Sequence, residues 1–396
     1  MTYTQTHPWL TFEINMKPAP QKLWIMLGEC QSKCYHIAGT PLPKEIAQEL
    51  YNVYLAKGAL ATTAIEGNTL SEEDVRKHLE GKLELPPSRE YQRQEVDNII
   101  VECNRLLGEI KSGKTLELSW KTIEEMNRAV LQKTPLQDGV IAGKIRSGTV
   151  TVGRYLAPPA DQCKNLLDRL CNWLNSKTFE YEPGNEVVFA ILKAIVAHVY
   201  LAWIHPFGDG NGRTARLVEF QILIGSGMPA LSCQLLSNHY NQTRTEYYRQ
   251  LDKASKSGGN VIPFIEYAVQ GFTEGLRSQI EMIRQKQMEL VWENYVHEQF
   301  KGKDSEGHKR RHDLVLDLSL QGEPIPWGKV KEITPRLAKL YAKLTDRTLL
   351  RDLEELQEMR LILFADQRVS ANKELVSAFL PTKAIVPQPG ESSKKN

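Results

Sequence analysis

The residues best suited to chemistry stand in one short segment, His205 to Arg216, which reads HPFGDGNGRTAR. Its glycines allow the backbone to approach a ligand closely, and a helix that begins near Asn211 to Arg213 would point unpaired backbone amides at an anion. Arg213 and Arg216 are three residues apart, so both guanidinium groups lie on one helix face and can reach adjacent phosphates. The segment therefore predicts a polyphosphate site, and two arginines suit a triphosphate.

Three other side chains of the segment complete this prediction. Asp209 offers a hard oxygen ligand that suits Mg²⁺ bridging phosphates, and His205 stands at the rim of the bend, where an imidazole suits a general base. Phe207 is apolar between polar neighbours, so we expect it to anchor the loop in the core. Taken singly, each residue has a structural explanation as a turn, a helix-end histidine or a surface ion pair. Together they favour a catalytic site.

The segment closely resembles the motif of the Fic family, H-x-F-x-[D/E]-G-N-G-R-x-x-R. Every fixed position is matched, by His205, Phe207, Asp209, Gly210, Asn211, Gly212, Arg213 and Arg216. The resemblance implies a protein adenylyltransferase, which transfers AMP from ATP to a Ser, Thr or Tyr hydroxyl of a target protein or of itself. Some relatives transfer phosphate or phosphocholine, but the intact G-N-G-R stretch favours AMP.

The same resemblance implies a role for each residue. His205 would deprotonate the target hydroxyl, and Asp209 would hold Mg²⁺. Asn211 and the amides of Gly210 and Gly212 would receive the α-phosphate, and the two arginines, Arg213 and Arg216, would hold the β- and γ-phosphates.

An upstream segment, TTAIEGN, resembles the inhibitory signature [S/T]-x-x-x-E-[G/N] of Fic proteins. It places Thr62 and Glu66 one helical turn apart on one face. The resemblance implies that Glu66 pairs with Arg216 and keeps ATP in an unproductive pose. The alternative is a solvated carboxylate at a helix end. Some relatives use this glutamate to remove AMP, and the sequence leaves that activity open.

Two further segments extend the resemblance. A hairpin predicted around Ser147-Gly148 resembles the family's flap, so residues Ile145 to Val152 are expected to dock an extended segment of the target protein by strand addition. Its alternative is an ordinary surface hairpin. Tyr248 and Ser255 fall where relatives place an adenosine pocket, although Tyr247-Tyr248 can equally be core and Ser255 stands where asparagine is common.

Helices must position these residues, because helical periodicity dominates the chain from about residue 45 to residue 300. One apolar run, Val187 to Ile204, is long enough to span a membrane, but Lys193 and His198 interrupt it. We therefore expect a helix buried in a bundle and no membrane partner. The expected fold is mainly α, a Fic-type helical bundle with a small β-hairpin flap, an N-terminal helical region and a C-terminal winged helix.

Four regions are expected along the chain. They are an N-terminal helical region with the inhibitory motif (1–110), a Fic catalytic domain (111–300), a winged-helix-like domain (301–380) and a disordered tail (381–396). Helical patterns over 335–344 and 347–359, followed by LILF and RVSA, suggest the winged helix. The arginines of its second helix are balanced by acids, namely Asp352, Glu354, Glu355 and Glu358. Protein docking is therefore preferred to DNA, and a nucleotide-responsive DNA-binding regulator is the alternative function.

Composition names no partner, since 50 Lys and Arg against 48 Asp and Glu leave a net charge of +2. The six cysteines show no C-x-x-C pair, which favours free buried thiols. The start MTYTQTHPWL lacks the pattern of a signal peptide, so a cytoplasmic protein is expected. The sequence leaves open the target protein, the signal that releases Glu66 and a possible homodimer.

Overall fold

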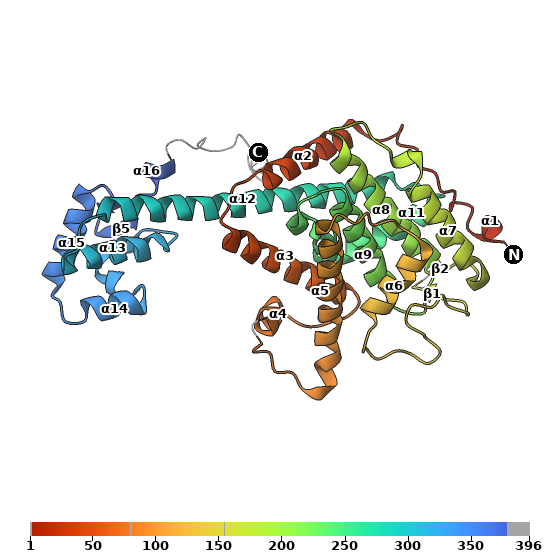
Figure 1. Ribbon diagram of the computed structural model, residues 1–396, viewed down its shortest axis with the longest axis horizontal. Helices are drawn as coiled ribbons and strands as arrows, with labels where there is room; N and C mark the ends of the chain where they lie inside the picture. The colour runs from red at the N-terminus through yellow and green to blue at the C-terminus, as the bar shows by residue number, and fades with distance from the viewer. Residues whose placement is uncertain (1, 80, 154, 378–396) are drawn as a thin grey trace, which may run out of the picture. The chain divides into compact units, whose positions relative to one another are not determined.

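The computed structural model describes residues 2–79, 81–153 and 155–377, and the chain divides into two compact units, Met1–Ile280 and Glu281–Asn396 (Figure 1). The division falls within one long helix, α12 (Ile262–Phe300), about twenty residues before the boundary expected from the polar segment that begins at 301. The expected division at residue 110 stays a prediction. The expected disordered tail, 381–396, lies outside the described residues.

The first unit is built of helices. They are α1 (Tyr3–Thr6), α2 (Gln21–Ala38), α3 (Lys44–Ile65), α4 (Glu72–Leu79), α5 (Glu90–Lys111), α6 (Trp120–Val130), α7 (Cys163–Leu174), α8 (Glu186–Ile204), α9 (Asn211–Gly225), α10 (Leu235–Gln242), α11 (Arg244–Lys256) and the first part of α12. Short 3-10 turns lie at η1 (Pro87–Arg89), η2 (Ala160–Gln162), η3 (Lys177–Phe179) and η4 (Ala230–Ser232). The mainly helical fold expected from the sequence is confirmed.

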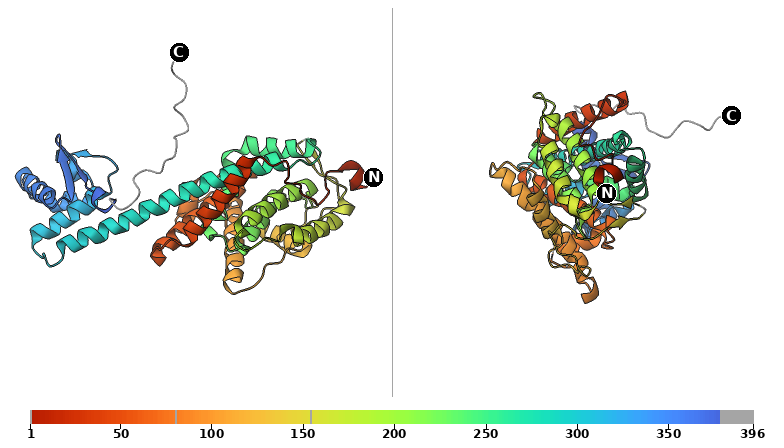
Figure 2. Two further views of the ribbon diagram at one scale, coloured as in Figure 1. Left: turned by 90° about the horizontal axis from the view of Figure 1, so that it is seen from above. Right: turned by 90° about the vertical axis from the view of Figure 1, so that its right-hand side faces the viewer.

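The core of this unit is the pair α8 and α9, which pack against each other more extensively than any other two described elements. Among the described residues, α8 is the one helix long and apolar enough to cross a membrane, and 78% of its apolar stretch is buried inside the structure. Helices α7 and α2 cover it. Helix α2 also runs beside the first part of α12 (Figures 1 and 2), where Arg277 pairs with Glu29 at 2.7 Å.

The predicted hairpin is present but displaced along the chain. Strand β1 (Thr151–Val152) pairs antiparallel with β2 (Tyr155–Leu156), so the turn lies near Gly153, whose φ is +59°, and not at Ser147-Gly148. Ile145 pairs with Phe207 of the motif loop instead of with the hairpin. The register differs because Arg146, whose N–H donates to Pro206 O at 2.9 Å, anchors this end of the segment to the motif loop.

The second unit combines helices with a small sheet. After the end of α12 come α13 (Glu306–Ser319), β3 (Ile325–Pro326), η5 (Trp327–Glu332), α14 (Pro335–Tyr341), α15 (Asp346–Glu358), β4 (Ile362–Ala365), β5 (Arg368–Ala371) and α16 (Glu374–Ser377). The antiparallel sheet has the strand order β3-β5-β4. The two predicted helices and the β-ribbon are confirmed. The assignment to the winged-helix class stays a prediction.

The charge balance of α15 assumed that all its acids lie on the surface. One of them, Asp352, is buried. Asp352 has no exposed surface and accepts hydrogen bonds from Arg310 at 2.7 and 3.1 Å, from Arg311 at 3.2 Å and from Tyr341 at 2.9 Å. Both arginines come from α13. Asp352 therefore joins helices inside the unit and does not offset the arginines on the exposed face of α15.

Asp352→Asn is expected to destabilise the second unit by roughly 3 kcal/mol, because it leaves Arg310 without its ion-pair partner, while Arg311 keeps Glu355 at 2.8 Å. Urea unfolding measures the loss, and hydrogen exchange of α13 to α15 locates it. Glu354→Gln, a matched change at an exposed position of the same helix, should leave both measurements unchanged. Equal stability of Asp352→Asn and Glu354→Gln would contradict the assignment.

Candidate active site

The candidate base, His205, stands at the end of α8. Its backbone N–H donates the last hydrogen bond of the helix to Leu201 O at 2.9 Å. His205 itself adopts the left-handed conformation, with φ 47° and ψ 59°. The following residue, Pro206, cannot continue a helix. A residue other than glycine in this conformation carries backbone strain, which the surrounding structure has to hold in place.

The loop that follows is fastened by two asparagines. The side chain of Asn211 accepts from Phe207 N and donates to Phe207 O, both at 2.9 Å, and Phe207 is 1% exposed, which confirms it as a core anchor. Asn127 of α6 donates to Asp209 O at 2.9 Å and accepts from Gly143 N at 2.9 Å. Because both polar atoms of the Asn211 side chain are engaged, that side chain shapes the loop, and the amides at the start of α9 face the ligand side.

The loop opens onto a cavity of about 490 Å³ in the first unit. The motif, the inhibitory segment, the hairpin and the expected adenosine pocket all contribute to its lining. The residues discussed below are Glu66, Val152, Tyr155, His198, His205, Asn211, Gly212, Tyr247, Tyr248 and Ser255. The structure thus brings together residues that the sequence singled out in four separate segments.

Burial and charge set the state of His205. Burial is the main reason that its pKa is lowered from 6.5 to about 4, and the positive charge of Arg146 lowers it further. A hydrogen bond with the Ala202 backbone and the charges of Glu66 and Asp209 act in the opposite direction but do not outweigh burial. The imidazole is therefore neutral near pH 7 and can accept a proton.

Arg216 is buried and already engaged. Its Nη2 donates to Glu66 Oε1 at 2.6 Å and to Thr62 O at 2.8 Å, and its Nε donates to Thr62 Oγ1. A Cβ atom built on Gly212 would collide with Glu66 Oε1, so the carboxylate lies directly over the first turn of α9. Glu66 therefore occupies the place where the helix N-terminus would receive a phosphate.

Glu66 is ionised in this position. Burial acts to raise its pKa, but the charge and hydrogen bond of Arg216, with the charge of Arg213, outweigh burial and lower the pKa. The end of α3 is held as well, because Ile65 O accepts from Arg244 and from Tyr248 Oη. The predicted face-sharing of Thr62 and Glu66 toward Arg216 is thus present in the structure.

Arg213 is held by two carboxylates. Its Nη1 donates to Glu95 Oε1 of α5 at 2.8 Å and its Nη2 donates to Asp209 Oδ1 at 3.1 Å. Asn68, two residues after Glu66, donates to the other oxygen of Glu95 at 2.9 Å. The motif gave no sign of Glu95, which lies far from it in sequence.

The expected adenosine pocket has a buried polar floor. Tyr248 and Ser255 both line the cavity, as the resemblance implied. Beside them the Tyr247 hydroxyl lies 2.8 Å from His198 Nε2, and His198 Nδ1 lies 3.3 Å from Glu219 Oε2. In the sequence, His198 stands out only as an interruption of an apolar run. Its position seven residues before His205, two helical turns earlier on the same helix, was the available signal.

Asp209 is the one motif carboxylate that could hold a cation. Its side chain is 37% exposed, and Oδ1 already accepts from Arg213 and from Gly210 N. Among the described residues no group of three or more His, Cys, Asp or Glu could hold a metal ion. This arrangement fits Mg²⁺, which commonly takes one or two protein carboxylates and completes its shell with phosphate and water oxygens.

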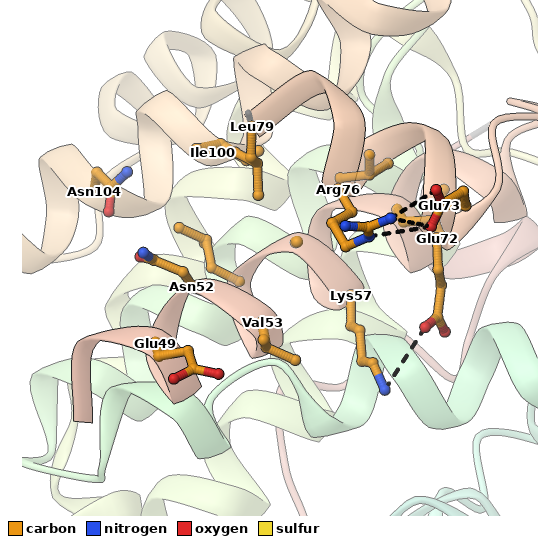
Figure 3. Close-up of a pocket in the computed structure, with 14 residues that line it drawn as sticks. Glu49, Asn52, Val53, Lys57, Glu72, Glu73, Arg76, Leu79, Ile100 and Asn104 are labelled. Atoms are coloured by element: carbon orange, nitrogen blue, oxygen red, sulfur yellow. Dashed lines mark hydrogen bonds and ion pairs between the residues drawn. The ribbon is translucent and has the colours of Figure 1, made fainter. Parts of the chain in front are cut away.

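A second hollow, of about 550 Å³, lies between α3, α4 and α5 and contains no motif residue (Figure 3). Its floor is apolar and its rim is charged, with Lys57 3.7 Å from Glu72 and Arg76 2.7 Å from Glu73. Size alone would favour this hollow. The candidate active site is assigned to the 490 Å³ cavity because a neutral histidine, the start of α9 and Glu66, the partner of Arg216, all line it.

Comparison with known proteins identifies the class. Residues 117–223, which include the whole motif from His205 to Arg216, match the family model described as Fic/DOC family. The resemblance stated from the motif is thereby confirmed.

Several relatives are protein adenylyltransferases. The chain is 32% identical over 248 residues to protein adenylyltransferase fic-1 of Caenorhabditis briggsae, a match that covers 62% of this chain and 45% of the relative. It is 33% identical to fic-1 of Caenorhabditis elegans, with 62% and 44% covered. The chain thus matches less than half the length of these two relatives.

Solved structures give the same fold. Fic-1 of C. elegans superposes with a TM-score of 0.53 at 27% identity, over 67% of this chain and 74% of that one. A Fic family protein from Desulfovibrio desulfuricans G20 has a TM-score of 0.55 at 20% identity, over 90% of this chain and 97% of that one, and supports the fold alone.

Proposed function

We propose that the chain is a protein adenylyltransferase that transfers AMP from ATP to a Ser, Thr or Tyr hydroxyl of a target protein or of itself. The observation that carries the proposal is one cavity that contains a neutral imidazole, His205, beside the start of α9, with Arg213 and Arg216 next to it. The activity named for the nematode relatives supports it.

AMP transfer depends on positioning of the hydroxyl and the α-phosphate and on neutralisation of the phosphate charge more than on covalent catalysis by the protein. His205 accepts the proton of the target hydroxyl as its oxygen bonds to the α-phosphorus and pyrophosphate leaves. The first amides of α9 face the α-phosphate, and the guanidinium groups of Arg213 and Arg216 face the β- and γ-phosphates. Asp209 would hold Mg²⁺, which neutralises phosphate charge when bound.

The target segment docks on the hairpin in this proposal. Strand β1 is exposed, with Val152 42% exposed, and Val152 and Tyr155 line the cavity next to His205. An extended segment that pairs with β1 would carry its hydroxyl to the imidazole.

Glu66 restrains the enzyme in this proposal. Its carboxylate lies over the amides of α9 and binds Arg216, so a triphosphate and Glu66 compete for the same donors. Release of the end of α3 would free both the amides of α9 and the Arg216 guanidinium for the triphosphate.

Mass spectrometry of the Glu66→Gly chain, incubated with ATP and Mg²⁺, tests the function. One adenylyl group on a protein side chain is the expected increment, and it should be absent from the chain that also carries His205→Ala. Transfer of phosphate, or no transfer to any candidate target or to the chain itself, would overturn the proposal.

One observation favours the second candidate function, a nucleotide-responsive DNA-binding regulator. With Asp352 buried, Arg347 and Arg351 are left exposed on α15, next to exposed Lys339 and Lys343 of the preceding segment. These four cations could contact a phosphate backbone, although exposed Glu354 and Glu358 share the α15 face with the two arginines. Salt-dependent, sequence-selective binding of duplex DNA without any labelled protein product would favour this function over the first.

A further inference from the structure

Arg146 is buried, at 8% exposed, in an arrangement that differs from that of the other buried arginines of the site. Within the described part of the chain no carboxylate pairs with it. Its guanidinium instead donates to three backbone carbonyls, with Nε on His205 O at 2.8 Å, Nη1 on Gly148 O at 2.6 Å and Nη2 on Pro158 O at 2.5 Å.

Those carbonyls belong to three different parts of the site. Gly148 precedes β1 and Pro158 follows β2, so two of the bonds hold both ends of the hairpin. The third holds His205, and the backbone N–H of Arg146 donates to the next carbonyl, Pro206 O, at 2.9 Å. One planar side chain therefore joins the expected target-docking strand to the candidate base.

The contact has a specific consequence for His205. Its left-handed backbone is strained, and its carbonyl direction is fixed by Arg146 on one side while its N–H is fixed by Leu201 O on the other. The direction of the imidazole depends on this backbone. Only the guanidinium, with five donors in a rigid fork, can reach three carbonyls at once.

We propose that Arg146 is a positioning residue that couples the β1–β2 hairpin to His205, so that a target segment paired with the hairpin and the base are placed together. The meaning of this coupling rests on the proposed adenylyltransferase function. The coupling itself can be measured without catalysis.

Arg146 also acts on His205 through its charge. Arg146 contributes to the lowered pKa of His205, against the opposing charges of Glu66 from the end of α3 and Asp209 from the motif loop. The remaining titratable groups that line the cavity are Tyr155, His198, Tyr247, Tyr248 and Asp252. Removing the positive charge should therefore raise the pKa of His205, so that the imidazole becomes protonated at a higher pH.

The test uses the full chain with Glu66→Gly as the parent. Arg146→Met should lower kcat by roughly 10- to 100-fold, since small misplacement of a catalytic group has effects of this size, and should move the acid limb of the rate profile to higher pH. Arg146→Lys keeps the charge but cannot bind three carbonyls, so kcat should fall while the acid limb stays in place. Lys144→Met, the same charge change at an exposed position two residues earlier, should change neither.

Two readouts do not need activity. NMR titration of labelled His205, assigned with the His205→Ala chain, should show a raised pKa in Arg146→Met. Hydrogen exchange should rise in residues 147–158 of both Arg146 variants but not in Lys144→Met. If the Glu66→Gly parent transfers nothing, the proposed function fails while these measurements still decide the coupling.

The proposal is overturned if Arg146→Met keeps the parent rate and the parent titration of His205. It is also overturned if the Lys and Met variants lose activity equally while hydrogen exchange and the His205 titration stay unchanged, because the loss would then come neither from the hairpin nor from His205.

Discussion

The Glu66→Gly chain is expected to transfer AMP to protein about 10- to 100-fold faster than the unmodified chain. Glu66 Oε1 lies 2.6 Å from Arg216 Nη2 and covers Gly212, so its removal frees the donors that a triphosphate needs. Breaking a buried ion pair costs roughly 3–5 kcal/mol, and a side chain that is 32% exposed belongs below that range. About 1.4 kcal/mol corresponds to a factor of ten, which gives the expected gain.

The change is expected to lower stability. Glu66 ends α3 at φ −88°, outside the left-handed region that favours glycine, and its removal leaves the buried Arg216 without its ion-pair partner. Incorporation of α-labelled ATP measures the rate. Glu66→Gln tests the charge alone and should give a smaller gain, while Glu45→Gln, at an exposed position in the first turn of the same helix, should give none. If Glu66→Gly has the same rate and the same ATP affinity as the unmodified chain, the proposed inhibitory role of Glu66 is contradicted.

The part of the site that lies in one segment was predictable because spacing alone determines it. Pro206 and the glycines predict the end of α8, and the start of α9 at Asn211 follows from the same loop. Arg213 and Arg216 then share a face through helical geometry. The inhibitory pair was predictable for the same reason, since Thr62 and Glu66 are one turn apart, although their meeting with Arg216 came from the family resemblance and not from the residues.

The side chains that hold the site in place were not predictable. Glu95 is 118 residues from Arg213, Asn127 is 82 residues from Asp209, and Arg146 is 59 residues from His205. Each is a polar residue with an ordinary surface explanation in the sequence. Their roles depend on which helices pack together, and periodicity does not specify the partner of a face.

Two errors have a related cause. The turn of the hairpin was placed five to six residues too early because short strands have weak register, and the contact of Arg146 with the motif loop fixed it elsewhere. Asp352 was counted as a surface acid because its helix was considered alone. The arginines of α13 that surround it decide its burial.

Replacing His205 in the Glu66→Gly chain should lower the rate of AMP transfer by roughly 10²- to 10⁴-fold, the usual contribution of a general base. His205→Asn is the sharper variant, since asparagine tolerates the left-handed backbone better than alanine and should keep the loop in place. ATP affinity should stay within about twofold of the parent if the imidazole acts on the proton and not on nucleotide binding. His36→Ala, an exposed histidine on α2, should leave the rate unchanged.

The pKa of His205 is lowered to about 4 with Glu66 in place, and the charge of Glu66 acts to raise it. In the Glu66→Gly parent the imidazole is therefore deprotonated above about pH 4, and the rate should fall only at or below that pH. This acid limb should disappear with the imidazole. An undiminished rate in His205→Asn, or an acid limb that persists in its residual activity, would assign the base to another group.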